Sequence, residues 1–316
     1  MLMLVFTAGQ AACALSVSYW MLMAARTLTG VTLGAFFGIG SVVASNVVGE
    51  ARQGRAIAIM FGGLTIANIL GVPLGAFVGQ QWGWRVSFWI VSACSTAALA
   101  GLFFLLPSQK PPRAGQSVRQ ELRPLKQPAV WAGLVTTMFS QAAIFAVFSY
   151  MAPILTDLAG FAPPSVPPLL ALFGAGTFIG TFIGGRIVDR FLHQNLVFGL
   201  IILAIVLGLL PSAVAHQTAM LACVLFFGIS AFAVNPALQT QVMVVASDAP
   251  TFTSSINISA FNVGNTIGPW LGGLLIGSGF GLGAPAYLAA ALALISVVAA
   301  IAAHRLRQNA MSPSVA

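Results

Sequence analysis

The chain alternates between long apolar stretches and short polar intervals along its whole length. Each apolar stretch is close to the roughly twenty residues that an α-helix needs to cross the hydrocarbon core of a bilayer. The stretches lack the alternation of polar and apolar positions that is typical of membrane β-strands. The pattern predicts about ten membrane helices, at residues 1–16, 18–47, 56–79, 86–106, 129–156, 166–184, 194–212, 217–246, 251–278 and 284–303.

One polar interval is longer than the others, at residues 109–128, and its prolines and charges predict a linker. We therefore expect an N-terminal bundle of four helices at residues 1–106 and a cytoplasmic linker at residues 107–128. A C-terminal bundle of six helices is expected at residues 129–304, followed by a cytoplasmic tail at residues 305–316.

Composition places these helices in a lipid environment. Hydrophobic residues make up 59% of the chain and charged residues 6%, with a mean hydropathy of +0.97. A soluble domain carries roughly a quarter charged residues, so a water-soluble fold is excluded and the lipid bilayer is the expected environment. The net charge of +8 does not indicate nucleic-acid binding, because the basic residues lie in short loops rather than on one helix face.

The basic residues predict how the chain is oriented. Cytoplasmic loops of membrane proteins are enriched in Lys and Arg, and most of the basic residues fall in loops on one side of the predicted helices. Both ends of the helical region are therefore expected to be cytoplasmic, in the inner or plasma membrane. The residues on that side are Arg52, Arg55, Lys110, Arg113, Arg119, Arg123, Lys126, Arg186, Arg190, Arg305 and Arg307.

An internal repeat links the two halves. The stretch ANILGVPLG at 67–75 corresponds to GNTIGPWLGG at 264–273, although the proline is displaced by one position. Weak internal symmetry of this kind is typical of transporters built from paired helical halves. The equivalent positions, 197 residues apart, are Asn68 and Asn265, Gly71 and Gly268, and Gly75 and Gly272.

Under this offset, the region from about 129 to 197 has no counterpart in the first half. We therefore expect a complete relative to carry twelve helices, two of them before the first helix seen here. The chain is then a fragment, the product of a wrong start site, or a genuine ten-helix variant.

Four short motifs resemble signatures of the major facilitator superfamily, in its drug:proton antiporter branch of twelve-helix exporters. Further glycine-rich stretches, at 34–40 and 259–273, are most similar to the arabinose-efflux-permease-like and chloramphenicol-resistance-like exporters. The four motifs are GGRIVDR at 184–190 with Gly185, Asp189 and Arg190; AARTLTG at 24–30 with Arg26 and Gly30; GVPLG at 71–75 with Gly71, Pro73 and Gly75; and GWRVSFW at 83–89.

The resemblance implies an all-α membrane protein in which two helical bundles rock around a central cavity. It implies proton-coupled efflux of small amphipathic compounds, either drug-like molecules or sugars, by a monomer that uses the proton gradient and no cofactor. The sequence has no phosphate-binding GxxxxGK[ST] motif and no evident nucleophile with a base, so an enzyme is not expected. An uptake carrier or facilitator, and a non-transporting remnant or membrane interaction protein, stay as alternatives.

Arg26 and Gly30, which belong to one motif, are candidates for the proton and substrate pathway, and Arg26 is the candidate for proton transfer. An ionised side chain inside a membrane helix costs roughly 3 kcal/mol unless it is paired or wetted. The resemblance implies an arginine that faces the cavity and supports proton transfer. The alternative is that its side chain extends to the outer interface of the membrane.

Polar residues in the fifth and eighth segments are candidates for the substrate pathway. Thr137, Ser140 and Gln141 share one face at helical spacing, as do Asn235 and Gln239. The resemblance places these segments, with the second, around the substrate. The same residues could instead form hydrogen bonds between helices.

The remaining candidates concern conformational change. Glycines in rows, including Gly30, permit close helix packing, but next to Pro73 and Pro269 they also predict bends at which the bundles flex. Gly71, Gly75, Gly268 and Gly272 belong to these two sites. Gly185, Asp189 and Arg190 form either a solvated turn or, as the resemblance implies, a cytoplasmic gate.

Overall fold

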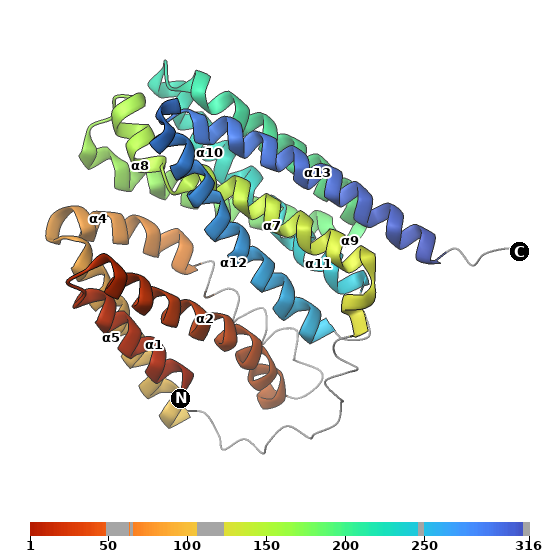
Figure 1. Ribbon diagram of the computed structural model, residues 1–316, viewed down its shortest axis with the longest axis horizontal. Coiled ribbons are helices and arrows are strands. Elements are labelled where there is room, and N and C mark those ends of the chain that lie inside the picture. The colour runs from red at the N-terminus through yellow and green to blue at the C-terminus, as the bar shows by residue number, and fades with distance from the viewer. Residues whose placement is uncertain (49–62, 64–65, 106–122, 246–249, 312–316) are drawn as a thin grey trace, which may run out of the picture. The chain divides into compact units, whose positions relative to one another are not determined.

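The computed structural model of the chain describes residues 1–48, 63, 66–105, 123–245 and 250–311 (Figure 1). These residues are almost entirely helical, and no strand occurs among them. The chain divides into two compact units, unit 1 at Met1–Gly115 and unit 2 at Gln116–Ala316, whose boundary lies inside the polar interval at 109–128.

Unit 1 is built around its first helix, α1, which packs against both α2 and α5. Thr7 Oγ1 donates a hydrogen bond to Ser95 Oγ at 2.9 Å, which ties α1 to α5. A π-helical stretch, η2, leads into α4, where Pro73 lacks the backbone N–H of a regular helical turn. The elements of unit 1 are α1 (Leu2–Ala14), α2 (Tyr19–Val48), η2 (Ala67–Gly71), α4 (Val72–Trp82) and α5 (Trp84–Leu105).

Unit 2 is a helical bundle in which α7 packs against α12 and α13, and α9 packs against α10, α11 and α13. The longer elements are α7 (Pro128–Phe148), α9 (Val166–Ala213), α10 (Gln217–Ala233), α11 (Asn235–Val245), α12 (Pro250–Leu275) and α13 (Ala284–Met311). The short elements are η3 (Arg123–Lys126), α8 (Met151–Pro153), η4 (Ile154–Leu158), η5 (Pro163–Ser165) and η6 (Ile276–Phe280).

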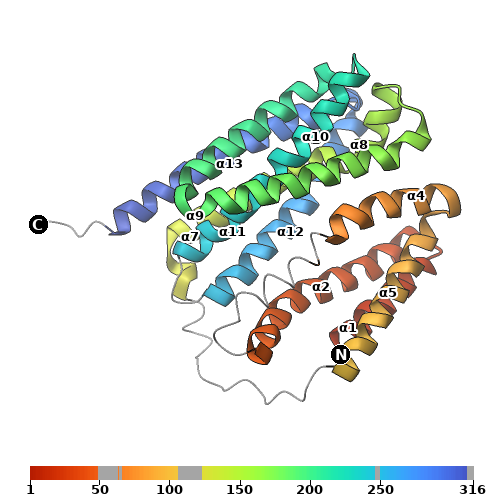
Figure 2. The ribbon, with the colours of Figure 1, turned by 180° about the vertical axis from the view of Figure 1, so that it is seen from behind.

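The helix α9 contains two predicted segments, which the structure keeps as separate candidate spans at Pro163–Ile187 and Leu192–Ala213. Only the backbone between them differs from the prediction. A loop was expected between the segments 166–184 and 194–212, but helical backbone continues through it. Residues 186–198 contain no Gly or Pro that would break a helix. The two arms of α9 run in opposite directions along α10 (Figure 2). Gly184, in the first arm, lies beside Ala233 at the end of α10. Val206, further along in the second arm, lies near the start of α10, where its carbonyl oxygen is 3.7 Å from Cys223 Sγ.

Two other predicted segments are interrupted. The segment 217–246 is divided at Val234 into α10 and α11, since Pro236 has no N–H to continue the backbone bonds of α10. The segment 129–156 leaves regular α-helix after Phe148.

Six helices in the described part of the chain are long and apolar enough to cross a membrane. The helices α2 and α12, with 30 and 26 residues, have comparable lengths. The segment 56–79 is described only at residue 63 and from residue 66 onward. The six spans are Trp84–Phe104, Pro128–Phe148, Pro163–Ile187, Leu192–Ala213, Gln217–Val245 and Ala284–Asn309.

Candidate functional site

A buried chain of polar side chains joins α7, α11 and α12 in unit 2. Thr137 Oγ1 donates to Asn257 Oδ1 at 2.8 Å, and Asn257 Nδ2 donates to Gln239 Oε1 at 2.7 Å. Gln239 Nε2 in turn donates to Ser254 Oγ at 2.5 Å. Thr137 and Asn257 are completely buried, whereas Gln239 is half-buried. The chain therefore runs from the core of unit 2 towards its surface.

A second pair lies at the break between α10 and α11. Gln141 Nε2, on α7, donates to Asn235 Oδ1 at 3.0 Å, and Asn235 is the first residue of α11. Ser140 does not join either group: its hydroxyl is buried and has no hydrogen-bond partner in the described part of the chain. Four of the five predicted pathway residues in these segments thus form interhelical hydrogen bonds.

The depth of these groups fits a site inside the membrane. Asn235 lies ten residues before Val245, the end of α11. At 1.5 Å per residue this separation is about 15 Å, or half of a hydrocarbon core of about 30 Å. Polar groups at a break in a membrane helix, near the midplane, are typical of transporter substrate sites.

Asn257 links the three helices but was not among the predicted site residues. Its signal in the sequence is an amide residue inside the predicted segment 251–278, within the unusually polar run TFTSSINIS. An uncharged amide in a membrane helix needs hydrogen-bond partners. That rule points to Asn257 as a buried polar group, although it does not identify the partners.

Glycines hold α12 against α7 in the same unit. A methyl group at Gly268 would lie 2.9 Å from the carbonyl carbon of Ala142, and one at Gly264 would lie 2.7 Å from Gln141 Cβ. These positions permit the two backbones to approach closely. The packing interpretation of Gly268 is therefore supported, while a flexing role at Pro269 stays a prediction.

Tyr150, which follows α7, adds a second contact to α12. Its hydroxyl donates to the Pro269 carbonyl oxygen at 2.8 Å, from just beyond the end of α7. Gly272 and Gly273 make room for the ring, since added methyl groups would lie 3.0 Å from Tyr150 Cε2 and 2.7 Å from its oxygen. The proline, the glycines and the tyrosine thus form one interhelical contact.

Replacing Tyr150 with phenylalanine should lower the free energy of unfolding by about 1 kcal/mol, because the ring stays while its hydrogen bond is lost. Thermal unfolding in detergent measures the effect. Tyr287→Phe is the control, since Tyr287 is 61% exposed. Equal melting temperatures for the two variants would contradict a stabilising role for the Tyr150 hydroxyl.

The equivalent positions of unit 1 are packed differently. Methyl groups at Gly71 and Gly75 would meet no atom of another described helix within 4 Å, and the same holds for Gly30 on α2. Pro73 is half-buried at the start of α4. The faces that correspond to the α12–α7 contact are therefore unpartnered in the described part of unit 1.

Arg26 lies about two turns from the start of α2 and is exposed. Its guanidinium carbon is 5.8 Å from the centre of the Phe88 ring on α5, within the range of a cation–π contact. No carboxylate in the described part of the chain pairs with it. Phe88 is thus the aromatic partner of Arg26. The role of Arg26 in proton transfer stays a prediction.

The predicted cytoplasmic gate lies where the arms of α9 reverse. Gly185 would accept a methyl group without contact within 4 Å, unlike its neighbour Gly184. The backbone at Asp189 and Arg190 is helical, but their side chains lie outside the described structure. Nearby, the rings of His193 and His304 stack with centres 3.8 Å apart, which links α9 to α13.

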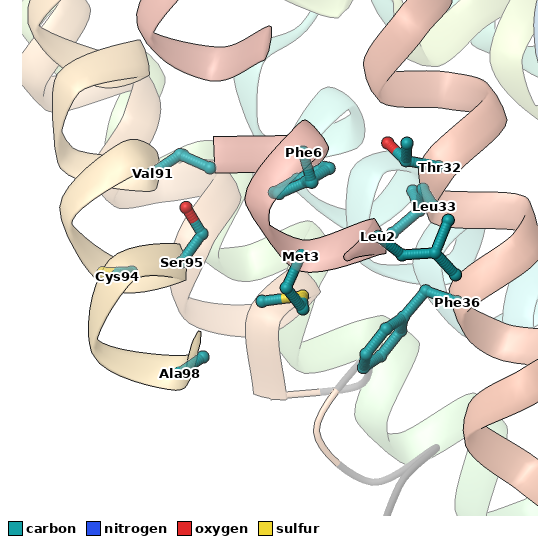
Figure 3. Close-up of a pocket in the computed structure, with 10 residues that line it drawn as sticks. All are labelled: Leu2, Met3, Phe6, Thr32, Leu33, Phe36, Val91, Cys94, Ser95 and Ala98. Atoms are coloured by element: carbon teal, nitrogen blue, oxygen red, sulfur yellow. The ribbon is translucent and has the colours of Figure 1, made fainter. Parts of the chain in front are cut away.

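A cavity of about 340 Å³ lies among α1, α2 and α5 in unit 1 (Figure 3). Its lining is mostly apolar, with the side chains of Phe6, Leu33 and Phe36 around it and Thr32 and Ser95 as polar groups. No predicted pathway residue lines it.

Comparison with known proteins identifies the family. The family model described as Major Facilitator Superfamily matches residues 1–260. The chain is 37% identical over 280 residues to the inner membrane transport protein YdhP of Escherichia coli strain K12, covering 89% of this chain and 72% of that protein. It is 32% identical over 300 residues to a chloramphenicol resistance protein of Streptomyces lividans, covering 94% and 76%.

The fold agrees with this relationship. The crystal structure of a bacterial homologue of the human lysosomal transporter Spinster superposes with a TM-score of 0.74 and 16% identity, covering 99% of this chain and 84% of that one. The resemblance read from the motifs, and the all-α membrane fold, are confirmed. The chain belongs to the major facilitator superfamily and is a membrane transporter of that type.

Proposed function

We propose that the protein exports small amphipathic compounds, drug-like molecules or sugars, in exchange for protons by alternating access. It would work as a monomer in the inner or plasma membrane, with its C-terminus in the cytoplasm and the proton gradient in place of a cofactor. The structural observation that carries the proposal is the pair of half-buried amides, Asn235 and Gln239, at mid-depth beside the α10–α11 break. The likeness to a chloramphenicol resistance protein supports chloramphenicol as a candidate solute, and 26% identity to a purine ribonucleoside efflux pump of Escherichia coli supports outward transport.

The face of α4 and η2 that carries Gly71 and Gly75 meets no other described helix of unit 1, which bears on the proposal. In unit 2, the counterparts of Gly71 and Gly75 pack against α7 and Tyr150. We expect the working transporter to place a helix equivalent to α7 on that face. If it has none, the cavity has lost one wall, which favours the second candidate function, a non-transporting membrane protein.

The test uses full-length protein in proteoliposomes with an acidic interior and an alkaline exterior. Radiolabelled chloramphenicol and arabinose are the probes. Exchange for protons predicts that at least one probe accumulates inside above its external concentration. Collapse of the gradient with nigericin and K⁺ should return it to the external value.

The other outcomes separate the alternatives. A probe that equilibrates without accumulating, whatever the gradient, indicates a facilitator. Accumulation only when the interior is the alkaline side indicates proton-coupled uptake. No movement of either probe contradicts the proposed export of these compounds and favours the non-transporting protein.

A further inference from the structure

The hydrogen bonds around Asn257 have a fixed direction. The Leu238 carbonyl oxygen can only accept, and Asn257 Nδ2 lies 3.4 Å from it. The NH₂ group of Asn257 must therefore face α11, and its oxygen must face the Thr137 hydroxyl, 2.8 Å away. Since Asn257 is 0% exposed, bulk water does not reach these groups.

The orientation of the Asn257 amide also fixes the orientation of the Gln239 amide. Because Asn257 donates, the Gln239 carbonyl oxygen turns inward to accept, at 2.7 Å. Its NH₂ group then points away from Asn257, towards Ser254, which uses one of its two hydrogens. One N–H of a half-buried amide is left for another acceptor.

Asn235 presents its amide in the same sense in the structure, although no carbonyl or hydroxyl fixes the direction of its bond with Gln141. Its oxygen accepts from Gln141, and its NH₂ group makes no hydrogen bond within the described part of unit 2. Asn235 and Gln239 are four residues apart on α11 and thus share one face. That face therefore presents N–H donors rather than carbonyl acceptors.

Most of the helices around these donors carry no charge. The helix α9, which also packs against α11, has Arg186, Asp189, Arg190 and His193 near its turn. The helices α7, α10, α11 and α12 contain no Asp, Glu, Lys, Arg or His. A charged solute would find no counter-ion there and would lose its hydration. A neutral solute with oxygen acceptors would instead satisfy the unused N–H groups.

We infer that Asn235 and Gln239 recognise acceptor oxygens of a neutral solute, and that Asn257 is the positioning residue that sets the direction of the Gln239 amide. The inference rests on the proposed function and specifies its substrate class. It also assigns a role to Asn257, which lies outside the four motifs quoted from this sequence.

The test compares two probes in the proteoliposome assay. Chloramphenicol is neutral and has amide, hydroxyl and nitro oxygens, whereas tetraphenylphosphonium is a lipophilic cation without hydrogen-bond acceptors. Gln239→Leu should raise KM for chloramphenicol about tenfold, the effect of roughly one hydrogen bond. Wild-type protein should move chloramphenicol but not tetraphenylphosphonium, because the helices that carry the two amides offer a cation no counter-ion.

Asn257→Ala tests the positioning role. It should raise KM for chloramphenicol by a similar factor with kcat kept. Combined with Gln239→Leu it should add almost nothing, because both changes remove the same contact. Asn262→Ala is the control, since Asn262 lies on the same helix, is exposed, and bonds only to Ile258 of its own helix.

Each outcome bears on a separate claim. Wild-type protein that moves none of chloramphenicol, arabinose and tetraphenylphosphonium overturns the proposed function and this inference with it. Wild-type protein that moves tetraphenylphosphonium alone overturns the inference and leaves transport standing. If Gln239→Leu leaves the chloramphenicol KM unchanged, the inference is also overturned. If the effects of Gln239→Leu and Asn257→Ala on KM add fully in the double variant, the positioning role of Asn257 is overturned.

Discussion

Gly184→Ala is expected to lower the stability of unit 2 strongly, by about 1–3 kcal/mol or more, as overpacking of a close contact does. The added methyl group would clash with the carbonyl oxygen of Ala233 and lie 2.8 Å from its carbonyl carbon. Backbone atoms cannot rotate away as a side chain can, so α9 and α10 must separate. Thermal unfolding in detergent measures the loss.

Gly185→Ala is the matched control, one residue further along α9. No atom of another described helix lies within 4 Å of its new methyl group. Alanine favours helix over glycine by up to about 1 kcal/mol, so this variant should melt at the same temperature or slightly higher. Equal destabilisation of both variants would show that the contact of Gly184 with α10 is not what limits stability.

The same control separates packing from gating. Gly185 belongs to the GGRIVDR motif, for which a cytoplasmic gate is predicted. If that prediction is right, Gly185→Ala reduces transport while its melting temperature is kept. Transport and stability that both stay at the wild-type level would leave Gly185 a solvated part of the turn.

The sequence predicted the helices well because burial in lipid requires long apolar stretches. Their interruptions were harder to predict. Pro236 lies inside an apolar run, and the hydropathy of 217–246 does not show that Val234 leaves the helix. Between 184 and 194 the opposite holds, since polarity predicted a loop but the backbone stays helical while the two arms of α9 reverse direction.

The candidate site was predicted as residue types on helix faces rather than as contacts. Helical spacing placed Asn235 and Gln239 together, but their partners Gln141 and Asn257 depend on how separate helices pack. Glycine spacing shows the same limit. Gly71 and Gly268 occupy equivalent positions in the repeat, yet only Gly268 meets another described helix.

Arg26→Ala is expected to abolish proton-driven transport while the protein still inserts into the membrane. Arg26 lies within α2, where an ionised side chain is costly, and its guanidinium contacts the Phe88 ring without a carboxylate partner in the described structure. A fixed positive charge disfavours the protonation of any group that comes close to it. Alanine removes that charge. Solute accumulation under an imposed pH gradient measures the effect.

Arg85→Ala is the matched control, because this arginine also stacks on an aromatic ring, that of Trp84 at 4.4 Å, and bonds to the Ser16 carbonyl oxygen at the end of α1. It should keep transport and lose only some stability. Arg26→Lys adds a test of charge, since it keeps the positive group but not the planar fork. Transport by Arg26→Ala at the level of Arg85→Ala would make Arg26 an interface residue whose side chain extends to the membrane surface. Activity retained in Arg26→Lys and lost in Arg26→Ala would assign proton coupling to the charge itself.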